Sequence, residues 1–313
     1  MADVVSLGSV NVDLFASVDE TSIKELSARY EWFPSPDETR AVASVPSAVD
    51  EYVDGIFIGG KGSNQAVAAA KAGVDAAFCG RVGTDHETYG VLETLSTRGV
   101  DTAGTEVADA ETGKAYVFVD EAGENRIAIV AGANATVDES YVDRHWETIR
   151  AADCLLLQNE IPMATMEATL ASLADVSDRP TVLFDPAPAE GAAPLLEYEA
   201  VDVVTPNAYE YERLGDAIGE FAGTVIRTRG SGTLVVERRA TGEEFTAPPP
   251  EVTPVDTTGA GDVFNGYLAA RLAAGDPLPA AVPAAVTAAS LATTHEGAQQ
   301  ATPSLAVVRD FMD

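Results

Sequence analysis

Short apolar runs that end in polar or glycine-bearing turns alternate with helix-like stretches along most of the chain. The expected strands lie at 4–10, 76–83, 154–160, 181–187, 201–207, 224–230 and 232–238. The expected helices include 63–73, 86–98, 163–174 and 263–274. Strands that alternate with helices form a mainly parallel sheet with helices on both faces. We therefore predict a doubly wound α/β fold, in one domain that spans residues 1–313.

Two regions depart from this alternation, at 12–58 and 114–131. Residues 114–131 alternate apolar and polar side chains around the turn EAGEN, a pattern typical of a β-hairpin. We expect parts of both regions to form a small β-sheet lid beside the main sheet.

The chain is strongly acidic, because 50 acidic residues against 19 basic ones give a formal charge of −31. Such a surface repels nucleic acids and anionic lipids, so we expect neither as a partner. The acids are spread along the whole chain, which favours adaptation to a high-salt cytosol, where a Debye length of about 3 Å at 1 M screens their repulsion. An ordinarily acidic enzyme is the alternative.

The sequence also predicts a cytoplasmic protein. No apolar stretch approaches the roughly 20 residues of a membrane helix, and the first residues lack the basic start and apolar run of a signal peptide. Cys79 and Cys154 lie in apolar surroundings, which is typical of buried thiols rather than of a disulfide framework.

Polar side chains gather where the predicted strands end, the edge at which open α/β sheets bind ligands. Asn11 and Asp13 follow the first strand, the glycine-rich run 59–64 opens a helix, and Glu160 and Asn207 end two later strands. Each has a structural alternative as a turn former, a loop residue or a helix cap. Taken together, they favour a single ligand-binding crevice.

The run VDTTGAGDVFNG at 255–266 places glycines around Asp262 where a helix begins. Unpaired N–H groups at a helix N-terminus bind phosphate, whereas a carboxylate repels it. Asp262 therefore either caps the helix or acts on the group that attacks the phosphate. The chain lacks a G-x-x-x-x-G-K-S/T run and a G-x-G-x-x-G after the first strand, which argues against a P-loop kinase and a nicotinamide dehydrogenase.

Eight stretches, in this order, resemble those of the ribokinase-like carbohydrate kinases, and most of all the ribokinases among them. They are GSVNVD at 8–13, GGKGSNQAVAAAKAG at 59–73, AGANATV at 131–137, LLLQNEIP at 155–162, DPAPAE at 185–190, DVVTPNAYEYERLG at 202–215, VDTTGAGDVFNG at 255–266 and EGAQQATPS at 296–304. The resemblance spans nearly the whole chain. It implies the ribokinase-like fold and phosphoryl transfer to a carbohydrate.

The resemblance also implies roles for individual residues. Asp262 would be the general base, and the backbone N–H groups of Gly259, Ala260 and Gly261 would form an anion hole for the transferred phosphate. Small residues permit the close backbone approach that this chemistry uses. The implied sugar contacts are Asn11, Asp13, Gly60, Lys61, Asn64 and Glu160. Carboxylates and amides of this kind bind the neighbouring hydroxyl groups of a polyhydroxyl ring.

On the nucleotide side, the resemblance implies ATP as co-substrate. Its contacts would be Asn207, Thr228, Gly230, Ser231, Gly232 and Gly261. Glu210 would help to hold Mg²⁺ through water, as suits an ion that dehydrates reluctantly, and a solvated helix face is the alternative. A monovalent cation, potassium, would be held by Asp256, Thr258, Ala292, His295, Gly297 and Ala301. Ala301 stands where ribokinases commonly have a serine.

We therefore expect transfer of the γ-phosphate of ATP to the primary hydroxyl of a free sugar, D-ribose, which gives ribose 5-phosphate. No arginine lies in the matched sugar motifs, whereas a sugar phosphate normally calls for arginine forks. The alternative acceptors are a nucleoside, another sugar such as fructose or 2-keto-3-deoxygluconate, and a sugar phosphate reached by Arg40 or Arg126. A non-catalytic sensor is a more distant alternative. The segment 14–58 is longer than in ribokinases and would enlarge the lid, through which a homodimer could form.

Overall fold

The protein is described by a computed structural model over residues 2–36 and 38–313. Met1 and Asp37, the latter within the predicted lid, lie outside the described residues. The main sheet runs in the order β15, β14, β13, β12, β11, β10, β1, β5 and β6, and β7 pairs with β5. Neighbouring strands from β13 to β6 are parallel, whereas β14 and β15 add antiparallel strands at one edge. The predicted doubly wound, mainly parallel sheet is therefore confirmed.

The strands of the main sheet are short, and several are buried on both faces. In chain order they are β1 (Val4–Leu7), β5 (Ala76–Val82), β6 (Val100–Asp101), β7 (Thr105–Val107), β10 (Cys154–Gln158), β11 (Thr181–Asp185), β12 (Val201–Val204), β13 (Thr224–Arg229), β14 (Gly232–Arg238) and β15 (Glu243–Ala247). Side chains alternate between the faces: Leu156 joins one core, and Leu155 and Leu157 join the other. This two-sided burial explains why these strands read as apolar runs.

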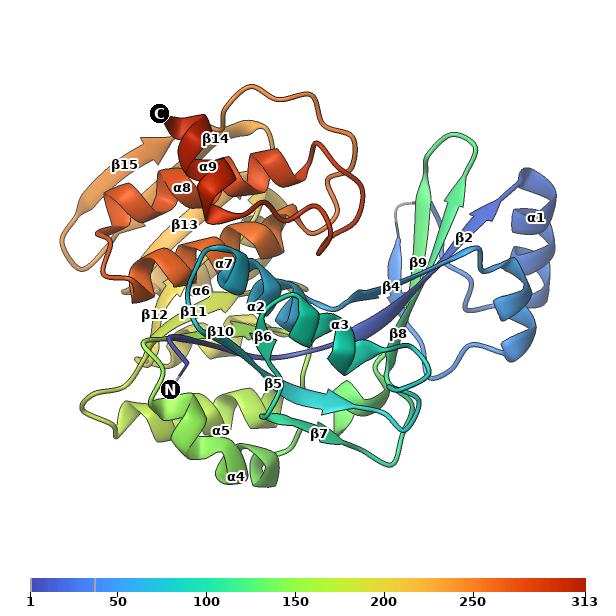
Figure 1. Cartoon of the computed structure of the whole chain (residues 1–313), viewed down its shortest axis with the longest axis horizontal. Coiled ribbons are helices and arrows are strands. Elements are labelled where there is room, and N and C mark those ends of the chain that lie inside the picture. Colours follow the sequence, from blue (N-terminus) through green and yellow to red (C-terminus); the bar gives the residue numbers. More distant parts are fainter. Residues whose placement is uncertain (1, 37) are drawn as a thin grey trace.

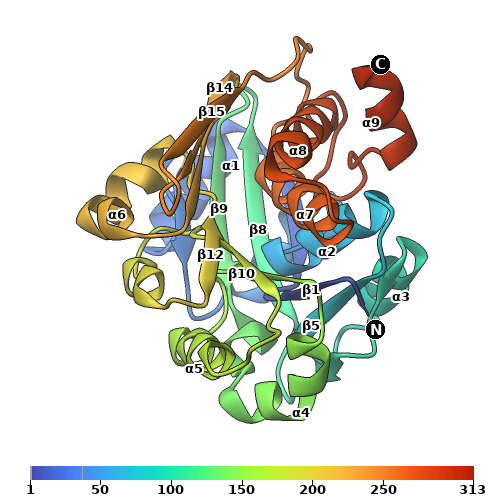
Figure 2. The ribbon, with the colours of Figure 1, turned by 90° about the vertical axis from the view of Figure 1, so that its left-hand side faces the viewer.

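Helices cover both faces of the main sheet (Figure 2). One face is covered by α2 (Lys61–Lys71), α7 (Ala260–Ala273), α8 (Leu278–Ala292) and α9 (Leu305–Met312). The other is covered by α4 (Glu139–Arg150), α5 (Met163–Ala174), the 3₁₀ turn η3 (Ala193–Glu197) and α6 (Ala208–Glu220). Within the described residues, no helix is both long enough and apolar enough to cross a membrane.

A second, smaller sheet projects from the main body (Figure 1). Its order is β3 (Thr39–Ala41), β9 (Asn125–Val130), β8 (Gly113–Asp120), β2 (Asn11–Val18) and β4 (Gly55–Gly59). Strands β8 and β9 form the hairpin expected at 114–131. The strand expected at 4–10 ends at Leu7, because the chain leaves the main sheet there and enters the small sheet at Asn11.

The two faces of the small sheet differ. On one face, Leu14, Tyr116 and Phe118 are buried against α1 (Glu20–Arg29), the turn η1 (Ser47–Tyr52) and Phe33. The register of the strands places Asp13 and Phe15 on the opposite face, beside Phe57, Val117 and Ile127. This opposite face, which we call the open face, begins at the predicted sugar contact Asp13.

Three predicted helices have different limits in the structure. The helix expected at 63–73 is α2, which starts and ends two residues earlier, at Lys61 and Lys71. The helix expected at 86–98 is only α3 (Val91–Thr97), because the residues before it form turns and Gly90 starts the helix from a left-handed conformation with φ 62°. The helix expected at 263–274 starts earlier, at Ala260, and thereby takes Asp262 into its first turn. The turn η2 (Gly132–Thr136) follows the hairpin and reaches the predicted site.

Candidate active site

Gly259 is the N-cap residue that precedes α7, at a position where only glycine fits. Its φ is 75°, and a Cβ there would lie 2.6 Å from the Cβ of Ala298. No side chain caps this helix, so Asp262 is not its cap. The Ala260 N–H donates to the Thr257 carbonyl at 3.3 Å, while the N–H groups of Gly259 and Gly261 have no partner among the described residues. The start of α7 therefore presents free donors beside a carboxylate.

The carboxylate of Asp262 is buried and held by two amides of α2. Asn64 Nδ2 donates to one oxygen at 2.8 Å, and Gln65 Nε2 donates to the other at 3.1 Å. Helices α2 and α7 approach closely because Gly266 lacks a side chain, and a Cβ there would lie 2.4 Å from the Gln65 carbonyl oxygen. Both carboxylate oxygens are thus fixed by the packing of two helices.

One lysine faces a group of carboxylates. Lys61 Nζ lies 4.0 Å from the Asp185 carboxylate, and the Lys61 N–H donates to Glu160 at 3.2 Å. Burial alone would lower the pKa of the Lys61 ammonium, but the charges of Asp262, Asp185, Glu160 and Glu210 outweigh it and raise the pKa. Lys61 therefore stays charged and partly neutralises the acids around it.

Three carboxyl groups in this crevice, those of Asp13, Asp185 and Glu160, have raised pKa values. Removal from solvent, together with the charges of Glu160 and Asp262, raises the pKa of Asp13 to about 8. Burial raises the pKa of Asp185 to about 7, although Lys61 opposes the shift. Burial also raises the pKa of Glu160, against the opposing effects of Lys61 and a hydrogen bond from Ser9. The crevice therefore has more acidic groups than Lys61 can neutralise, and it favours bound protons or positive ions.

The structure brings the predicted sugar contacts to one place. Asn11 and Gly59 are paired across β2 and β4, and Gly59 leaves room for the Asp13 carboxylate, from which a Cβ at Gly59 would lie only 2.0 Å away. Gly60 caps α2, so Lys61 and Asn64 extend from that helix toward Glu160 and Asp262. These predicted sugar contacts are therefore neighbours in the structure, at the ends of the strands where the sequence predicts a ligand-binding crevice.

A cavity of about 900 Å³ lies beside the start of α7. It is lined by 228–232, by the proline-rich run 249–254, and by residues of α7 and α8. The predicted nucleotide contacts Thr228, Gly230, Ser231, Gly232 and Gly261 are all among its lining residues, whereas Asn207 is not. Such a volume suits a ligand of nucleotide size.

Asn207 and Glu210 instead bind each other. The Asn207 side chain accepts from the Glu210 N–H at 2.9 Å, and the Glu210 carboxylate accepts from the Asn207 N–H at 2.7 Å and from its Nδ2 at 2.8 Å. This reciprocal capping box starts α6. Glu210 is buried and so does not lie on a solvated helix face.

The residues predicted to hold a monovalent cation lie on two loops, one before α7 and one after α8, except for Ala292, which is the last residue of α8. Asp256 joins these two loops. Its carboxylate accepts from the N–H groups of Thr258 and Gly297, each at 2.9 Å, and these bonds lower its pKa against the effect of burial. The Ala292 carbonyl accepts from His295, and the Gly297 carbonyl accepts from Ala301. Among the residues that the structure describes, no group of three or more His, Cys, Asp or Glu side chains is arranged to hold a metal ion.

Several buried polar residues at the site were missed by the sequence analysis: Gln65, Asn134, Gln158, Asp185 and Gln299. They lie in stretches that resemble the family, but nothing in their spacing marks them as contacts of the base or of other site residues. One signal existed, since Gln65 is followed by a run of alanines and valine in which a polar side chain needs a buried partner.

The chain is similar to known carbohydrate kinases. A family model described as "pfkB family carbohydrate kinase" matches residues 55–305. The ribokinase of Bacillus subtilis is 36% identical over 264 residues, which cover 81% of this chain and 87% of that protein. The ribokinase of Haemophilus influenzae is 30% identical over 321 residues, which cover 98% of this chain and 97% of that protein.

Solved structures agree with these relatives. The ribokinase of Thermotoga maritima is 32% identical with a TM-score of 0.80, over 100% of this chain and 99% of that one. The Arabidopsis thaliana ribokinase, solved with ribose and ATP, is 26% identical with a TM-score of 0.77, over 100% and 99% of the two chains. From its sequence, its fold and the arrangement of its site, we conclude that the chain belongs to the pfkB family of carbohydrate kinases and is a phosphotransferase.

Proposed function

We propose that this kinase transfers the γ-phosphate of ATP to the primary hydroxyl of free D-ribose, giving ribose 5-phosphate. The observation that carries the proposal is the buried carboxylate of Asp262, held at the crevice that collects Asn11, Asp13, Lys61 and Glu160. A crevice rich in acceptors, with few donors, suits a ligand that offers several hydroxyl groups. The ribokinases solved with ADP and with ribose and ATP support the choice of substrates.

In this proposal Asp262 is the general base. It takes the proton of the primary hydroxyl while that oxygen forms a bond to the γ-phosphorus and the bond from phosphorus to the ADP oxygen breaks. The free N–H groups of Gly259 and Gly261, with that of Ala260 if its long bond to Thr257 opens, would stabilise charge on the transferred phosphoryl group. Lys61 would add positive charge near the same oxygens.

The crevice fits Mg²⁺, because its acids offer oxygen ligands and outnumber Lys61, the cation that faces them. Glu210 and Asn207 would hold the ion, largely through water, since their own hydrogen bonds occupy part of their oxygen and nitrogen atoms. Bound Mg²⁺ would neutralise charge on the phosphates of ATP.

Potassium fits the loops joined by Asp256 mainly through backbone carbonyl groups. The carbonyls of Ala292 and Gly297 each accept one hydrogen bond and so keep a second lone pair. Asp256 and Thr258 would contribute from one side, and His295 and Ala301 from the other. Ala301 has no side-chain oxygen, so it would offer only its carbonyl group.

A free sugar fits better than a sugar phosphate, because the two arginines that could bind a phosphate lie on the wrong face. Strand register places Arg40 and Arg126 on the face of the small sheet opposite to Asp13. Arg126 is buried and pairs with Asp120 at 3.0 Å, and Arg40 pairs with Glu38 at 2.7 Å. Releasing either guanidinium would leave a carboxylate unpaired.

We also propose that the small sheet is the lid and that its open face contacts a second copy of the chain. Phe15 and Phe57 meet edge to face at 5.3 Å on this face, and Phe57 is 41% exposed. Apolar side chains gathered beside a polar ligand site would both exclude water and pack against a partner.

The charge of −31 further supports an enzyme that works in a high-salt cytosol.

The test is a panel of acceptors assayed with ATP and Mg²⁺ in concentrated potassium chloride. Ribose should have the highest kcat/KM, above fructose, 2-keto-3-deoxygluconate, ribose phosphates and nucleosides. A preference for ribose phosphates that disappears in Arg40→Ala or Arg126→Ala would contradict the choice of a free sugar. A preference for nucleosides would instead assign the long 14–58 segment to base recognition.

A further inference from the structure

Three amide side chains that point into the crevice are each paired with a second buried amide. The inner amides are Asn11, Asn64 and Gln65, and the outer amides that face them are Asn134, Gln299 and Gln158, in that order. In every pair the outer NH₂ group donates to the inner carbonyl oxygen, at 2.8, 2.8 and 2.7 Å. All six side chains are buried.

The orientation of two inner amides follows from the chemistry of the base. An ionised carboxylate can only accept hydrogen bonds, so Asn64 and Gln65 must turn their NH₂ groups toward Asp262. Gln65 also donates to Asp185 at 2.8 Å. Their carbonyl oxygens therefore face away from the base, where only a donor satisfies them.

The outer amide of Gln299 is fixed independently of Asp262, whereas the side-chain oxygen of Gln158 is buried without a hydrogen-bond partner among the described residues. The Gln299 oxygen accepts from Arg98, a side chain that has donors only, and Gln299 Nε2 donates to Ser63 Oγ at 2.9 Å as well as to Asn64. The Ser63 hydroxyl donates its own proton to the Gly59 carbonyl at 2.6 Å, so toward Gln299 it can only accept. Gln299 consequently presents its NH₂ group, and not its oxygen, to Asn64.

The third pair orients a sugar contact instead of the base. The Val10 N–H donates to Asn134 Oδ1 at 3.0 Å, and Asn134 Nδ2 donates to the Val10 carbonyl at 3.1 Å and to Asn11 Oδ1. The side-chain oxygen of Asn11 is therefore occupied. Its NH₂ group has no hydrogen-bond partner within residues 2–36 and 38–313, and so is available to a ligand. Asn11 is thereby set as a donor in a crevice rich in acceptors.

We propose that Asn134, Gln158 and Gln299 are positioning residues, which set the inner amides so that Asn11 donates to the substrate while Asn64 and Gln65 hold Asp262. The proposal rests on the proposed function, because it assigns these residues to the same reaction. A reversed Asn64 or Gln65 would turn a carbonyl oxygen toward the carboxylate and displace the base. If the amide of Asn11 were reversed, its oxygen instead of its NH₂ group would face the sugar, in a crevice whose carboxylates already supply acceptors.

A purely structural role makes a different prediction, and Gln299 separates the two. Gln299→Glu keeps the shape and the contact with Arg98, whereas Gln299→Met keeps the length and loses every hydrogen bond. If Gln299 only fills the core, the glutamate variant should be the more active. If it orients Asn64, the introduced carboxylate accepts from Asn64 and reverses it, so kcat should be about tenfold lower than in Gln299→Met near neutral pH.

The pH profile adds a readout that packing would not move. As pH falls, the introduced carboxyl gains a proton and can donate again, so the deficit of Gln299→Glu relative to Gln299→Met should shrink. Gln300→Glu is the matched control, since it makes the same change at the next residue, whose side chain is exposed. It should keep the profile of the unaltered enzyme. Equal or higher kcat in Gln299→Glu than in Gln299→Met at every pH would overturn the proposal.

Asn134→Asp provides the second measurement, because it acts on the sugar contact. The introduced carboxylate should reverse Asn11, raise KM for the acceptor by about tenfold and change kcat less. A change in kcat with KM unaltered would overturn the role given to Asn134. These comparisons use an acceptor that the unaltered enzyme phosphorylates. Absence of sugar phosphorylation in the unaltered enzyme would contradict the proposed function itself, whereas failure of the variant order in an active enzyme would contradict only this inference.

Discussion

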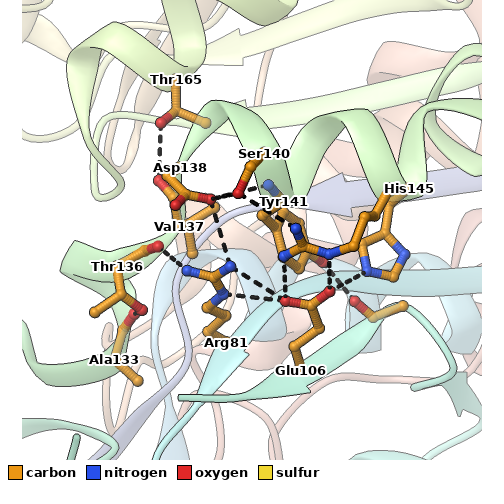
Figure 3. Close-up of polar contacts among 12 residues, drawn as sticks. Arg81, Glu106, Ala133, Thr136, Val137, Asp138, Ser140, Tyr141, His145 and Thr165 are labelled. Carbon is orange, nitrogen blue, oxygen red and sulfur yellow. Dashed lines mark hydrogen bonds and ion pairs between the residues drawn. The ribbon is translucent and has the colours of Figure 1, made fainter. Parts of the chain in front are cut away.

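Two acidic sites in this protein have opposite electrostatics. Around Glu106, Arg144 donates at 2.8 Å to each carboxylate oxygen. Arg81 Nε donates to the same carboxylate at 3.2 Å, and His145 Nε2 lies 3.1 Å from it (Figure 3). The hydrogen bonds from Arg144 lower the pKa of Glu106 to about 2, with further contributions from His145 and Arg81. In the crevice, by contrast, several carboxylates share Lys61, and the pKa values of Asp13 and Asp185 rise to about 8 and about 7.

The difference shows how the few cations of the chain are used. Arg81 also donates to the Thr136 carbonyl and pairs with Asp138 (Figure 3). The group formed by Glu106, Arg81, Arg144 and His145, which we call the Glu106 cluster, therefore links α4 and the turn η2 to β5 and β7. The crevice keeps its acids underpaired. A site of that kind binds cations and protons, which suits the proposed reaction, in which Mg²⁺ would be bound and a hydroxyl group would lose a proton.

The largest expected effect is in the crevice. Asp262→Asn should lower kcat by about 10²–10⁴-fold, because general-base assistance is worth that much, while KM for ribose and ATP changes little. Steady-state kinetics of the two enzymes measure it. Asp276→Asn, just beyond the other end of α7 and bonded to Arg271, is the control and should keep the original kcat. Unchanged turnover in Asp262→Asn would show that another group is the base.

The turn around Asp262 was recognisable from sequence because its glycines and its acid are close neighbours, and the main sheet was recognisable because its strands are buried on both faces. Gln65, Asp185 and Gln299 were not, because each acquires its role from residues about a hundred or more positions away. The limits of α3 depend on the left-handed conformation of Gly90, which apolar periodicity does not report.

The next largest effect concerns the Glu106 cluster. Glu106→Gln removes the charge that Arg81, Arg144 and His145 share, and should lower the free energy of unfolding by about 1–2 kcal/mol, a value kept small because this side chain is partly open to solvent. Urea denaturation measures the loss, and kcat should not change. Glu147→Gln, which touches only the exposed Arg150, should have a much smaller effect. Equal effects of the two variants would mean that the cluster does not hold the fold.

The two sites should also respond oppositely to pH. Glu106 has a lowered pKa in the folded state, so its contribution is present above about pH 4.5 and is lost as the pH falls toward 2. Asp13 and Asp185 have raised pKa values, so the folded state binds more protons than the unfolded state between about pH 4 and 8. Their contribution is present below about pH 4 and is lost as the pH rises through 7 to 8.

The free energy of unfolding, measured at constant ionic strength across this pH range, shows whether stability rises or falls with pH. Stability should decline from about pH 5 to 8, and Asp185→Asn should flatten that decline, because it removes one of the groups that titrate. The acidic side of the profile should persist in Asp185→Asn and weaken in Glu106→Gln. A slope near neutral pH that is identical in Asp185→Asn and the unaltered protein would contradict the raised pKa of Asp185.

The smallest expected effect is that of the monovalent cation. Replacing potassium by sodium at equal ionic strength should lower turnover by a few-fold, because the loops joined by Asp256 would hold the ion through carbonyl groups whose spacing selects by size. The melting temperature should be similar in the two salts. The charges of the Glu106 cluster are paired with one another, so its contribution to stability does not depend on which cation is present. Equal turnover in both salts would contradict the proposed potassium site.

The central claim is that Asp262 activates the primary hydroxyl of free ribose for attack on ATP. The most direct measurement is the position of the phosphate in the product, read by phosphorus and carbon NMR after incubation of ¹³C-labelled ribose with ATP, Mg²⁺ and the enzyme in potassium chloride. The product of the unaltered enzyme should show phosphorus coupling to C5, and Asp262→Asn should form none of this product within the same time. Phosphate on the anomeric carbon, or C5 phosphate formed equally well by both enzymes, would contradict it.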